Sequence, residues 1–195
     1  MERNPGRPRV ASLDDALIAA TAELLLESGF GGVTIQAVTT RAGTTRPSFY
    51  RRYSGIPELL LDMLRHRYGA SLLVDTGSLE TDLAAIQRDQ VAMFSDPLVR
   101  RCLAGFLDAL QYDEPLQRSF VDDFFQPRRT ATKDVIGRGV VRGEIRVPGD
   151  LEWICDLITS PFVMRATFPS LGPIDDKLAQ ATTRLALKEL GWKSS

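Results

Sequence analysis

The stretch TIQAVTTRAGTTRPSFYRRY, residues 34–53, decides the fold because it holds the start and stop features of two short helices. Thr34 is placed to cap the first helix, and Thr45 is placed to cap the second. Pro47 falls in the first turn of the second helix, where its missing amide hydrogen costs little. Gly43 lies between them, so we predict helix, tight turn and helix, the arrangement of a helix-turn-helix DNA reader.

A further helix is predicted immediately before this stretch. Ser12 and Asp15 form a capping-box pattern, and Gly29 is placed to end the helix. The apolar face of this helix has a 3.6-residue period and comprises Leu13, Leu17, Ala20 and Leu24. In the last short helix, the side chains expected on or near the buried side are Phe49, Tyr50 and Tyr53. The first 56 residues are therefore predicted to form a unit of three short helices.

Side chains suited to DNA gather at the start of the last short helix. Small hydrogen-bonding groups and one long basic arm are offered by Thr44, Thr45, Arg46 and Ser48. Arg46 is able to pair with guanine O6 and N7 or with a phosphate. Tyr50 offers a hydroxyl and Arg51 a charge on the outer side. Free backbone amides at the Thr34 and Thr45 helix ends are also expected to hold phosphates.

The same residues have a purely structural interpretation. Thr34 and Thr45 would then serve only as helix caps, and Tyr50 as a core residue. Arg51 and Arg52 would only form a solvated face of the helix. A generic helical hairpin has the same spacing, so spacing alone leaves both interpretations open.

Charge is distributed unevenly along the chain. The formal net charge is −1, which argues against wholesale coating of nucleic acid. Residues 1–56 nevertheless hold seven arginines against five acidic residues, whereas residues 57–195 hold 17 basic and 20 acidic side chains. The arginines of the first segment lie in a tail before Val10 and between Arg41 and Arg52. Both clusters flank the predicted helical unit.

Residues 34–53 closely resemble the helix-turn-helix motif of TetR-type transcriptional regulators. The preceding ALIAATAELLLESGFGGVT resembles the first helix and the Gly-Phe turn of that family. The likeness covers about the first third of the chain. It implies that DNA is approached by the residues that match the family's contacts, namely Thr34, Thr45, Arg46, Ser48 and Tyr50.

Two residues depart from the family pattern. Family members usually carry a lysine at the start of the fourth helix, where it touches a phosphate, but this chain has Ile56. Pro47 replaces a more frequent small residue. The backbone contact from the fourth helix is therefore expected to pass to Arg51, Arg52 or the basic tail.

A larger helical body is predicted over residues 57–195. Its helices are expected to begin at Pro57, after Gly77-Ser78, at Asp96-Pro97 and at Pro115, with a kink at Pro127. The segment GRGVVRGEIRVPGD, residues 137–150, is β-like but short and is predicted to be a loop. The last two helices are expected at about residues 150–165 and 174–190. The apolar face of the final helix is predicted to comprise Leu178, Ala181, Leu185 and Leu190.

Residues 128–165 resemble a common C-terminal variant of the same family. In that variant, the last two helices pair with the partner's copies as a four-helix bundle, and the remaining helices enclose an effector cavity. By that analogy, a small apolar or amphipathic effector would meet Met63, Met93, Phe106, Phe124, Phe125 and Trp153. Ordinary core packing is the alternative explanation for these side chains.

Length and composition exclude several classes of protein. A chain of 195 residues is long enough to bury a core without disulfides. No apolar run approaches the roughly 18–20 residues of a membrane span, and the basic N-terminus lacks the apolar segment of an export signal. Cys102 and Cys155, the two cysteines, are expected to be small buried groups in a reducing cytoplasm.

Nothing in the sequence indicates an enzyme, a metal site or a cofactor. His66 is the single histidine, so the two cysteines and His66 form no conventional zinc site. There is no Gly-rich phosphate loop and no serine or cysteine nucleophile motif.

We therefore predict an all-α protein with a basic arm over residues 1–9, a helix-turn-helix domain over 10–56 and an effector-binding and dimerisation domain over 57–195. The predicted function is a cytoplasmic transcriptional repressor that binds a palindromic operator as a homodimer and is released by its effector. A helical hydrolase or transferase with His66 as base is one alternative. A helical dimer that carries a small apolar molecule without binding DNA is another, suggested by Ile56.

Overall fold

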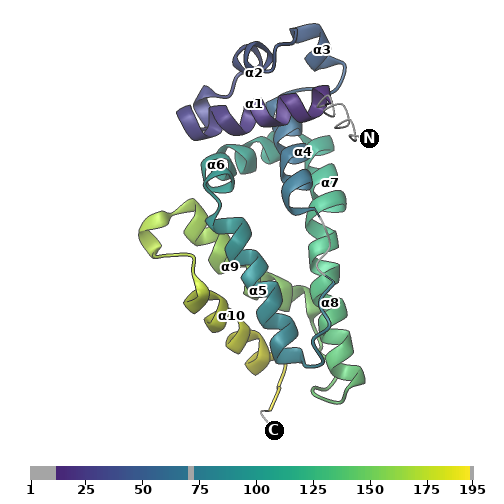
Figure 1. The fold of residues 1–195 in the computed structure, drawn as a ribbon. Coiled ribbons are helices and arrows are strands. Elements are labelled where there is room, and N and C mark those ends of the chain that lie inside the picture. Colours follow the sequence, from purple (N-terminus) through teal and green to yellow (C-terminus); the bar gives the residue numbers. More distant parts are fainter. Residues whose placement is uncertain (1–11, 70–72, 194–195) are drawn as a thin grey trace, which may run out of the picture. The chain divides into compact units, whose positions relative to one another are not determined.

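The computed structural model describes residues 12–69 and 73–193, and these residues are helical apart from turns and short loops. The predicted all-α fold is confirmed, since no strand occurs in the described ranges (Figure 1). The predicted basic arm, residues 1–9, lies outside them. The chain divides into two compact units, residues 1–63 and 64–195, and the division falls inside one helix.

The first unit contains three complete short helices, a 3₁₀ turn and the start of a fourth helix. These elements are α1 (Leu13–Ser28), η1 (Phe30–Gly32), α2 (Ile35–Arg41), α3 (Arg46–Tyr50) and α4 (Ile56–Tyr68). The predicted capping box is confirmed, because Asp15 N donates to Ser12 Oγ at 3.1 Å and Ser12 N donates to Asp15 Oδ2 at 3.0 Å. Gly29 ends α1 with a φ of 69°, a conformation that favours glycine.

Three details of this unit differ from the sequence prediction. The last short helix, α3, ends at Tyr50 rather than continuing to Tyr53. Tyr50 was expected near the buried side, but it is 57% exposed, because it follows the fully buried Phe49 and is turned about 100° around the helix axis. The fourth helix begins at Ile56, one residue before Pro57, and proline is accepted there because the first turn needs no amide donor.

The second unit is a bundle of helices. They are α5 (Leu79–Ser95), α6 (Pro97–Tyr112), α7 (Glu114–Phe120), α8 (Gln126–Val141), α9 (Leu151–Thr167) and α10 (Asp176–Glu189). A π-helical segment, Val121–Phe125, joins α7 to α8, and a 3₁₀ turn, Pro169–Leu171, follows α9. The predicted starts are confirmed at α5 and α6, which Ser78 and Asp96 cap. The predicted kink near Pro127 corresponds to the π-helical segment that precedes it.

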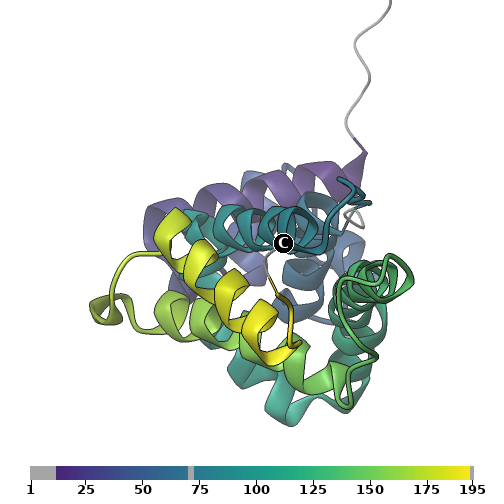
Figure 2. The same ribbon diagram turned by 90° about the horizontal axis from the view of Figure 1, so that it is seen from below.

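Helix α5 lies at the centre of this bundle and packs against α8, α9 and α10 (Figures 1 and 2). The buried side chains that form the core come from these four helices and the loop after α8. They include Leu79, Leu83, Ile86, Val135, Ile136, Ile145, Ile154, Ile158, Ala186 and Leu187. Gly139 of α8 allows a close approach, since a Cβ there would lie 3.1 Å from the Leu79 side chain.

Two predictions for this unit were wrong. Residues 137–141 continue α8 instead of forming a loop, because Gly139 packs against α5 and the helix ends only before Gly143, whose φ is 75°. On α10, Ala181 and Leu185 are exposed, and the buried face includes Thr182 and Thr183 instead. The two hydroxyls are accommodated because Thr182 donates to Gln87 Oε1 at 2.7 Å and Thr183 donates to the Ala179 carbonyl at 2.8 Å.

Candidate nucleic-acid interface and effector cavity

The turn between α2 and α3 is held by local hydrogen bonds. Thr34 caps α2 by accepting from Ala37 N at 3.1 Å, and Thr45 caps α3 by accepting from Ser48 N at 3.3 Å. Gly43 has a φ of 63°, which a residue with a Cβ adopts only with strain. The two cap predictions and the turn prediction are therefore confirmed, and α3 starts from a well-defined position.

Ser48 connects the start of α3 to its exposed end. Its Oγ accepts from Thr45 Oγ1 at 3.1 Å and from the Arg51 guanidinium at 2.9 Å. Arg51 is thereby held along α3 instead of extending freely. The spacing of three residues between these groups is the sequence feature that brings them onto one face of the helix.

The arginines that the structure describes in the first unit fall into two sets. Arg41 makes short ion pairs with Glu23 at 2.9 Å and Glu27 at 2.8 Å, and Arg52 pairs with Asp14 at 2.5 Å. The hydrogen bond from Arg41 lowers the pKa of Glu27. These two arginines therefore hold α1 against the elements that follow it.

Arg46 and Arg51 form the second set. Both side chains are exposed, and neither pairs with a carboxylate among the residues that the structure describes. Their charge is therefore available to a polyanion, in contrast to that of the paired arginines. The sequence showed one basic cluster between Arg41 and Arg52, but it could not show which members were already neutralised.

The segment that follows α3 is anchored to α4 by a hydrogen bond that the sequence analysis missed. Tyr53 is buried, and its hydroxyl donates to Asp62 Oδ2 at 2.6 Å. Burial and the hydrogen bond to Asp62 both raise the pKa of Tyr53, so the phenol stays protonated. Phe49 packs beside it, with ring centroids 5.7 Å apart. Tyr53 and Asp62 are nine residues apart and lie on either side of a turn, so helical periodicity does not predict their contact.

The predicted DNA-contacting residues all lie in the first unit. The exposed ones are Thr34, Thr45, Arg46, Tyr50 and Arg51, and the half-buried ones are Thr44 and Ser48. Fewer backbone amides are available at the start of α3 than predicted. Pro47 has no amide hydrogen, and the Ser48 amide is used by the Thr45 cap. A phosphate at this helix end would meet the Arg46 amide and side chain.

The second unit contains a mainly apolar cavity of about 300 Å³, at the lower end of the range for small-molecule sites. Its apolar walls come from α4 to α9 and include Leu64, Ile86, Met93, Phe94, Val99, Leu103, Phe106, Leu107, Phe120, Phe124, Phe125 and Val163. Four of the six predicted effector-binding candidates, Met93, Phe106, Phe124 and Phe125, line this cavity. The other two do not: Met63 is buried elsewhere on α4, and Trp153 is half exposed on α9.

The aromatic wall of the cavity is built around the π-helical segment. The Phe120 ring lies edge-on to Phe106 at 5.5 Å between centroids and stacks on Phe124 and Phe125 at 5.8 Å. A π-turn adds a residue to the helix and changes the direction of the side chains that follow. The last turn of α4 is attached to this segment, since Arg65 donates to the Ser119 carbonyl at 3.0 Å and to Asp123.

Polar groups also line the cavity. Arg128 and Arg129 lie over the Phe124 and Phe125 rings, with the guanidinium carbons 5.7 and 5.2 Å from the ring centroids. Gln90 is 7% exposed, and its amide nitrogen donates to Thr159 Oγ1 at 3.1 Å. Gln90 and the two arginines are functional candidates that the sequence analysis did not name, because it considered only apolar side chains for this site.

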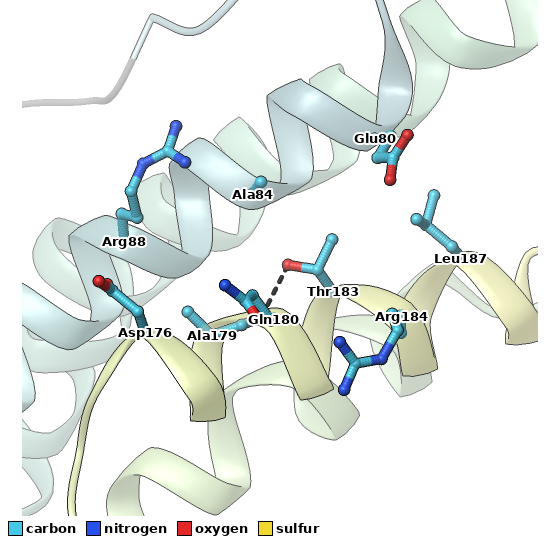
Figure 3. A pocket seen from close by; sticks show the side chains of 9 residues that line it. All are labelled: Glu80, Ala84, Arg88, Asp176, Ala179, Gln180, Thr183, Arg184 and Leu187. Atoms are coloured by element: carbon cyan, nitrogen blue, oxygen red, sulfur yellow. Dashed lines mark hydrogen bonds between the residues drawn. The ribbon is translucent and has the colours of Figure 1, made fainter.

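A second hollow of about 360 Å³ lies between α5 and α10 (Figure 3). The small side chains of Ala84 and Ala179 let the two helices approach. Charges of both signs surround them, on Glu80, Arg88, Asp176 and Arg184. The Thr183 hydroxyl is already used by the Ala179 carbonyl at 2.8 Å. This groove is open and polar, and it lacks the apolar enclosure of the cavity.

The remaining chemically reactive side chains form no site. Cys102 and Cys155 are buried and unpaired, and burial raises the pKa of the Cys102 thiol to about 12, so it stays protonated. Within residues 12–69 and 73–193, no three His, Cys, Asp or Glu side chains gather as they would around a metal ion. No helix in those ranges is long and apolar enough to span a membrane.

Comparison with known protein families gives two matches. Residues 17–63 match the family described as bacterial regulatory proteins, tetR family, and residues 73–186 match the tetracyclin repressor-like C-terminal domain. The chain is 31% identical to the HTH-type transcriptional regulator YdeS of Bacillus subtilis, over 85% of this chain and 83% of that protein. It is 27% identical to the DNA-binding transcriptional repressor TetR of Mycobacteroides abscessus, over 83% and 84%.

Solved structures show the same fold. FadR from Bacillus subtilis, in complex with stearoyl-CoA, has a TM-score of 0.71 at 13% identity, over 89% of this chain and 97% of that one. A TetR transcription regulator from Haloarcula marismortui has a TM-score of 0.70 at 19% identity, over 92% and 96%.

Proposed function

The chain belongs to the TetR family of DNA-binding transcriptional regulators, and we propose that it is a repressor that binds a palindromic operator as a homodimer and is released by a small-molecule effector. Repression is supported by the relative from Mycobacteroides abscessus, which is a transcriptional repressor. Within this proposal, residues 1–9 are a basic arm, 10–56 recognise DNA, and 57–195 bind the effector and dimerise. Its site of action is the cytoplasm, where operator DNA is accessible.

The observation that carries the proposal is the exposed, unpaired positive charge on α3. Arg46 is placed to read a base edge or to bind a phosphate, with Thr44, Thr45 and Ser48 beside it. Tyr50 is the last residue of the same short helix, Arg51 caps its C-terminal end, and Thr34 caps the helix before it. Ile56 cannot make the phosphate contact of the family's lysine, so we assign that contact to Arg51, which Ser48 holds along α3.

Dimerisation through the last two helices is supported by exposed apolar side chains. Five large ones, each more than 40% exposed, lie on α9, α10 and the turn between them: Trp153, Met164, Phe168, Leu171 and Leu185. Helices α9 and α10 lie side by side (Figure 2). Exposed apolar residues concentrated on neighbouring helices are typical of an interface. A dimer would also double the small surface that one helix-turn-helix buries on DNA.

Effector binding is supported by the apolar cavity of the second unit. Met93, Phe106, Phe124 and Phe125 line it, and we retain these four as effector contacts. The FadR structure with stearoyl-CoA shows that a protein of this fold holds a small molecule. Helix α4 runs from the DNA-reading unit to the cavity wall, where Leu64 lines the cavity and Arg65 donates to Asp123 of the π-helical segment. A change in the cavity would therefore be transmitted along α4.

The experiment that tests this function measures binding to DNA from the protein's own promoter region by fluorescence anisotropy and footprinting. We expect affinity to fall steeply as salt rises, because phosphate contacts release counterions. Footprinting should show two protected half-sites about 34–36 Å apart, or a multiple of that. A single asymmetric half-site would contradict the palindromic dimer. Absence of binding at about 50 mM salt would favour the carrier that has lost DNA binding.

A further inference from the structure

We propose that the cavity selects an uncharged, mainly apolar ligand that donates a hydrogen bond to Gln90 Oε1. This inference rests on the proposed effector-binding function and specifies its chemistry. Three observations support it: the charge balance beside the cavity, the unpaired acceptor of Gln90 and the apolar character of the walls.

The positive charges beside the cavity are already neutralised. Arg128 makes an ion pair with Asp89 and also donates to the Tyr68 carbonyl at 2.8 Å. Arg129 donates to Glu152 at 2.8 Å and to Asp156 at 2.5 Å. Lys133 pairs with Glu152 as well, so three cations face three carboxylates: Arg128, Arg129 and Lys133 against Asp89, Glu152 and Asp156.

The pKa values of the paired groups agree with this balance. Hydrogen bonds from Lys133 and Arg129 lower the pKa of Glu152. Burial alone would lower the pKa of Arg129, but its hydrogen bonds to Asp156 and Glu152 outweigh burial and raise it. Both shifts favour the ionised forms of Glu152 and Arg129. An anionic ligand would find no uncommitted cation in these walls and would lose its hydration without compensation.

Gln90 lines the cavity and has one buried acceptor that the described residues leave unused. Its amide nitrogen is engaged by Thr159, but no described residue donates to Gln90 Oε1. A buried acceptor of this kind favours a partner with a donor, because a ligand without one would leave Oε1 unpaired when it displaces water. The site therefore discriminates between ligands that carry an O–H or N–H group and otherwise similar ligands that do not.

The character of the cavity walls indicates the shape and polarity of the rest of the ligand. Phe106, Phe120, Phe124 and Phe125 form a continuous aromatic surface, and aliphatic side chains from α5 and α6 complete it. Flat aromatic groups gain most from such a surface, since they pack edge-on or offset against the rings. A compact aromatic compound with one donor group matches the volume of about 300 Å³.

The test uses three naphthalene probes of similar size with the full-length protein. 1-Naphthol carries a donor, 1-acetylnaphthalene carries only an acceptor, and 1-naphthoate is an anion at pH 7. Calorimetry should show that wild type binds 1-naphthol about tenfold or more tighter than either of the others. The readout is binding alone, so it is independent of any effect on DNA.

Two variants test the hydrogen bond to Gln90 and the charge balance of the walls separately. Gln90→Leu should abolish the preference for 1-naphthol over 1-acetylnaphthalene while both still bind. Asp89→Asn releases the Arg128 charge, so it should raise the affinity for 1-naphthoate about tenfold and leave 1-naphthol nearly unchanged. Circular dichroism verifies that each variant is folded.

The outcomes are distinct. Preference for 1-acetylnaphthalene or 1-naphthoate in wild type would overturn the proposal, and so would the absence of binding by all three probes. The comparison of the three probes on wild type tests the proposal even if Gln90→Leu fails to fold. If 1-naphthol binds as expected but does not change promoter binding, the ligand chemistry stands and the regulatory function fails.

Discussion

The two units use arginine in opposite ways. In the DNA-reading unit, Arg46 and Arg51 are exposed and pair with no carboxylate of the described residues. Beside the cavity, Arg128 and Arg129 are largely buried and each is matched by acidic side chains. Unpaired charge on a surface attracts a polyanion, whereas paired charge in a wall holds helices together. Under the proposed function, the same residue type therefore serves a nucleic-acid interface in one unit and an electrically neutral ligand site in the other.

The units also differ in how their structure is specified. Short-range caps and a positive-φ glycine define the helix-turn-helix, with hydrogen bonds three residues apart in sequence. The body depends on side chains brought together over long distances, such as Gln87 with Thr182 and Arg128 with Asp89. The first unit is the smaller of the two, so it should be the more easily unfolded part.

Phe49→Ala gives the strongest test of the expected difference in stability between the two units. Phe49 is fully buried and packs against Tyr53, so its truncation should cost about 3–5 kcal/mol of the first unit's stability. Both tryptophans, Trp153 and Trp192, lie in the second unit, so their fluorescence reports that unit alone. In urea, circular dichroism should show an early partial transition while the tryptophan transition stays in place. Simultaneous early loss of both signals would show that the units unfold together.

Arg46→Ala tests whether this unpaired arginine contacts DNA. Loss of a base contact should cost about 1–3 kcal/mol per half-site and relax the preference at one operator position. A uniform loss across operator variants, with a smaller salt dependence, would identify a phosphate contact instead. The matched control is Arg88→Ala, which removes the same charge from an exposed position on α5. Unchanged affinity for Arg46→Ala would remove Arg46 from the interface.

Asp82→Asn tests the charge pairing of the body. Asp82 is fully buried and accepts from Thr76 N at 2.6 Å, from Thr76 Oγ1 at 2.7 Å and from Arg142 at 3.3 Å. Burial raises the pKa of Asp82, but these hydrogen bonds outweigh burial and lower it. The ionised carboxylate therefore stabilises the fold above the unfolded pKa of about 3.9, and this contribution is lost as pH falls through the lower folded pKa.

The substitution should cost about 1–2 kcal/mol at pH 7, measured by urea unfolding. At pH 3 the difference from wild type should be smaller, because this pH lies below the unfolded pKa of about 3.9, where part of the stabilisation by the ionised carboxylate is already lost. Asp75→Asn is the control, since Asp75 is mostly exposed and lies 3.5 Å from Arg142. An equal loss at both pH values would show that shape, not charge, accounts for the effect of Asp82.

The sequence predicted features that depend on neighbours along the chain and missed those that depend on packing. The caps at Ser12, Thr34 and Thr45 were predictable because donor and acceptor are three residues apart. The buried face of α10 was not, because Thr182 becomes compatible with burial only through Gln87, 95 residues away. Gln90 and Arg128 gave no sequence indication of a site, since their partners lie on other helices.

The smallest expected effect concerns the coupling of the two units. Arg65 lies on the last turn of α4 and donates to the Ser119 carbonyl, the Ser119 hydroxyl and Asp123. These partners lie in and beside the π-helical segment that carries Phe124 and Phe125 into the cavity wall. If a cavity ligand shifts this segment, Arg65 is the side chain through which α4 responds.

Arg65→Met keeps the length of the side chain but removes its hydrogen bonds. In wild type, saturating promoter DNA should weaken 1-naphthol binding by about 5–150-fold, because linkage makes the coupling reciprocal. Arg65→Met should reduce that coupling by about 0.5–2 kcal/mol while 1-naphthol still binds the DNA-free protein. Arg118→Met is the control, since it breaks an exposed ion pair with Glu114 on α7. If both variants keep the wild-type ratio of affinities, the ligand acts on DNA binding by a route that does not include Arg65.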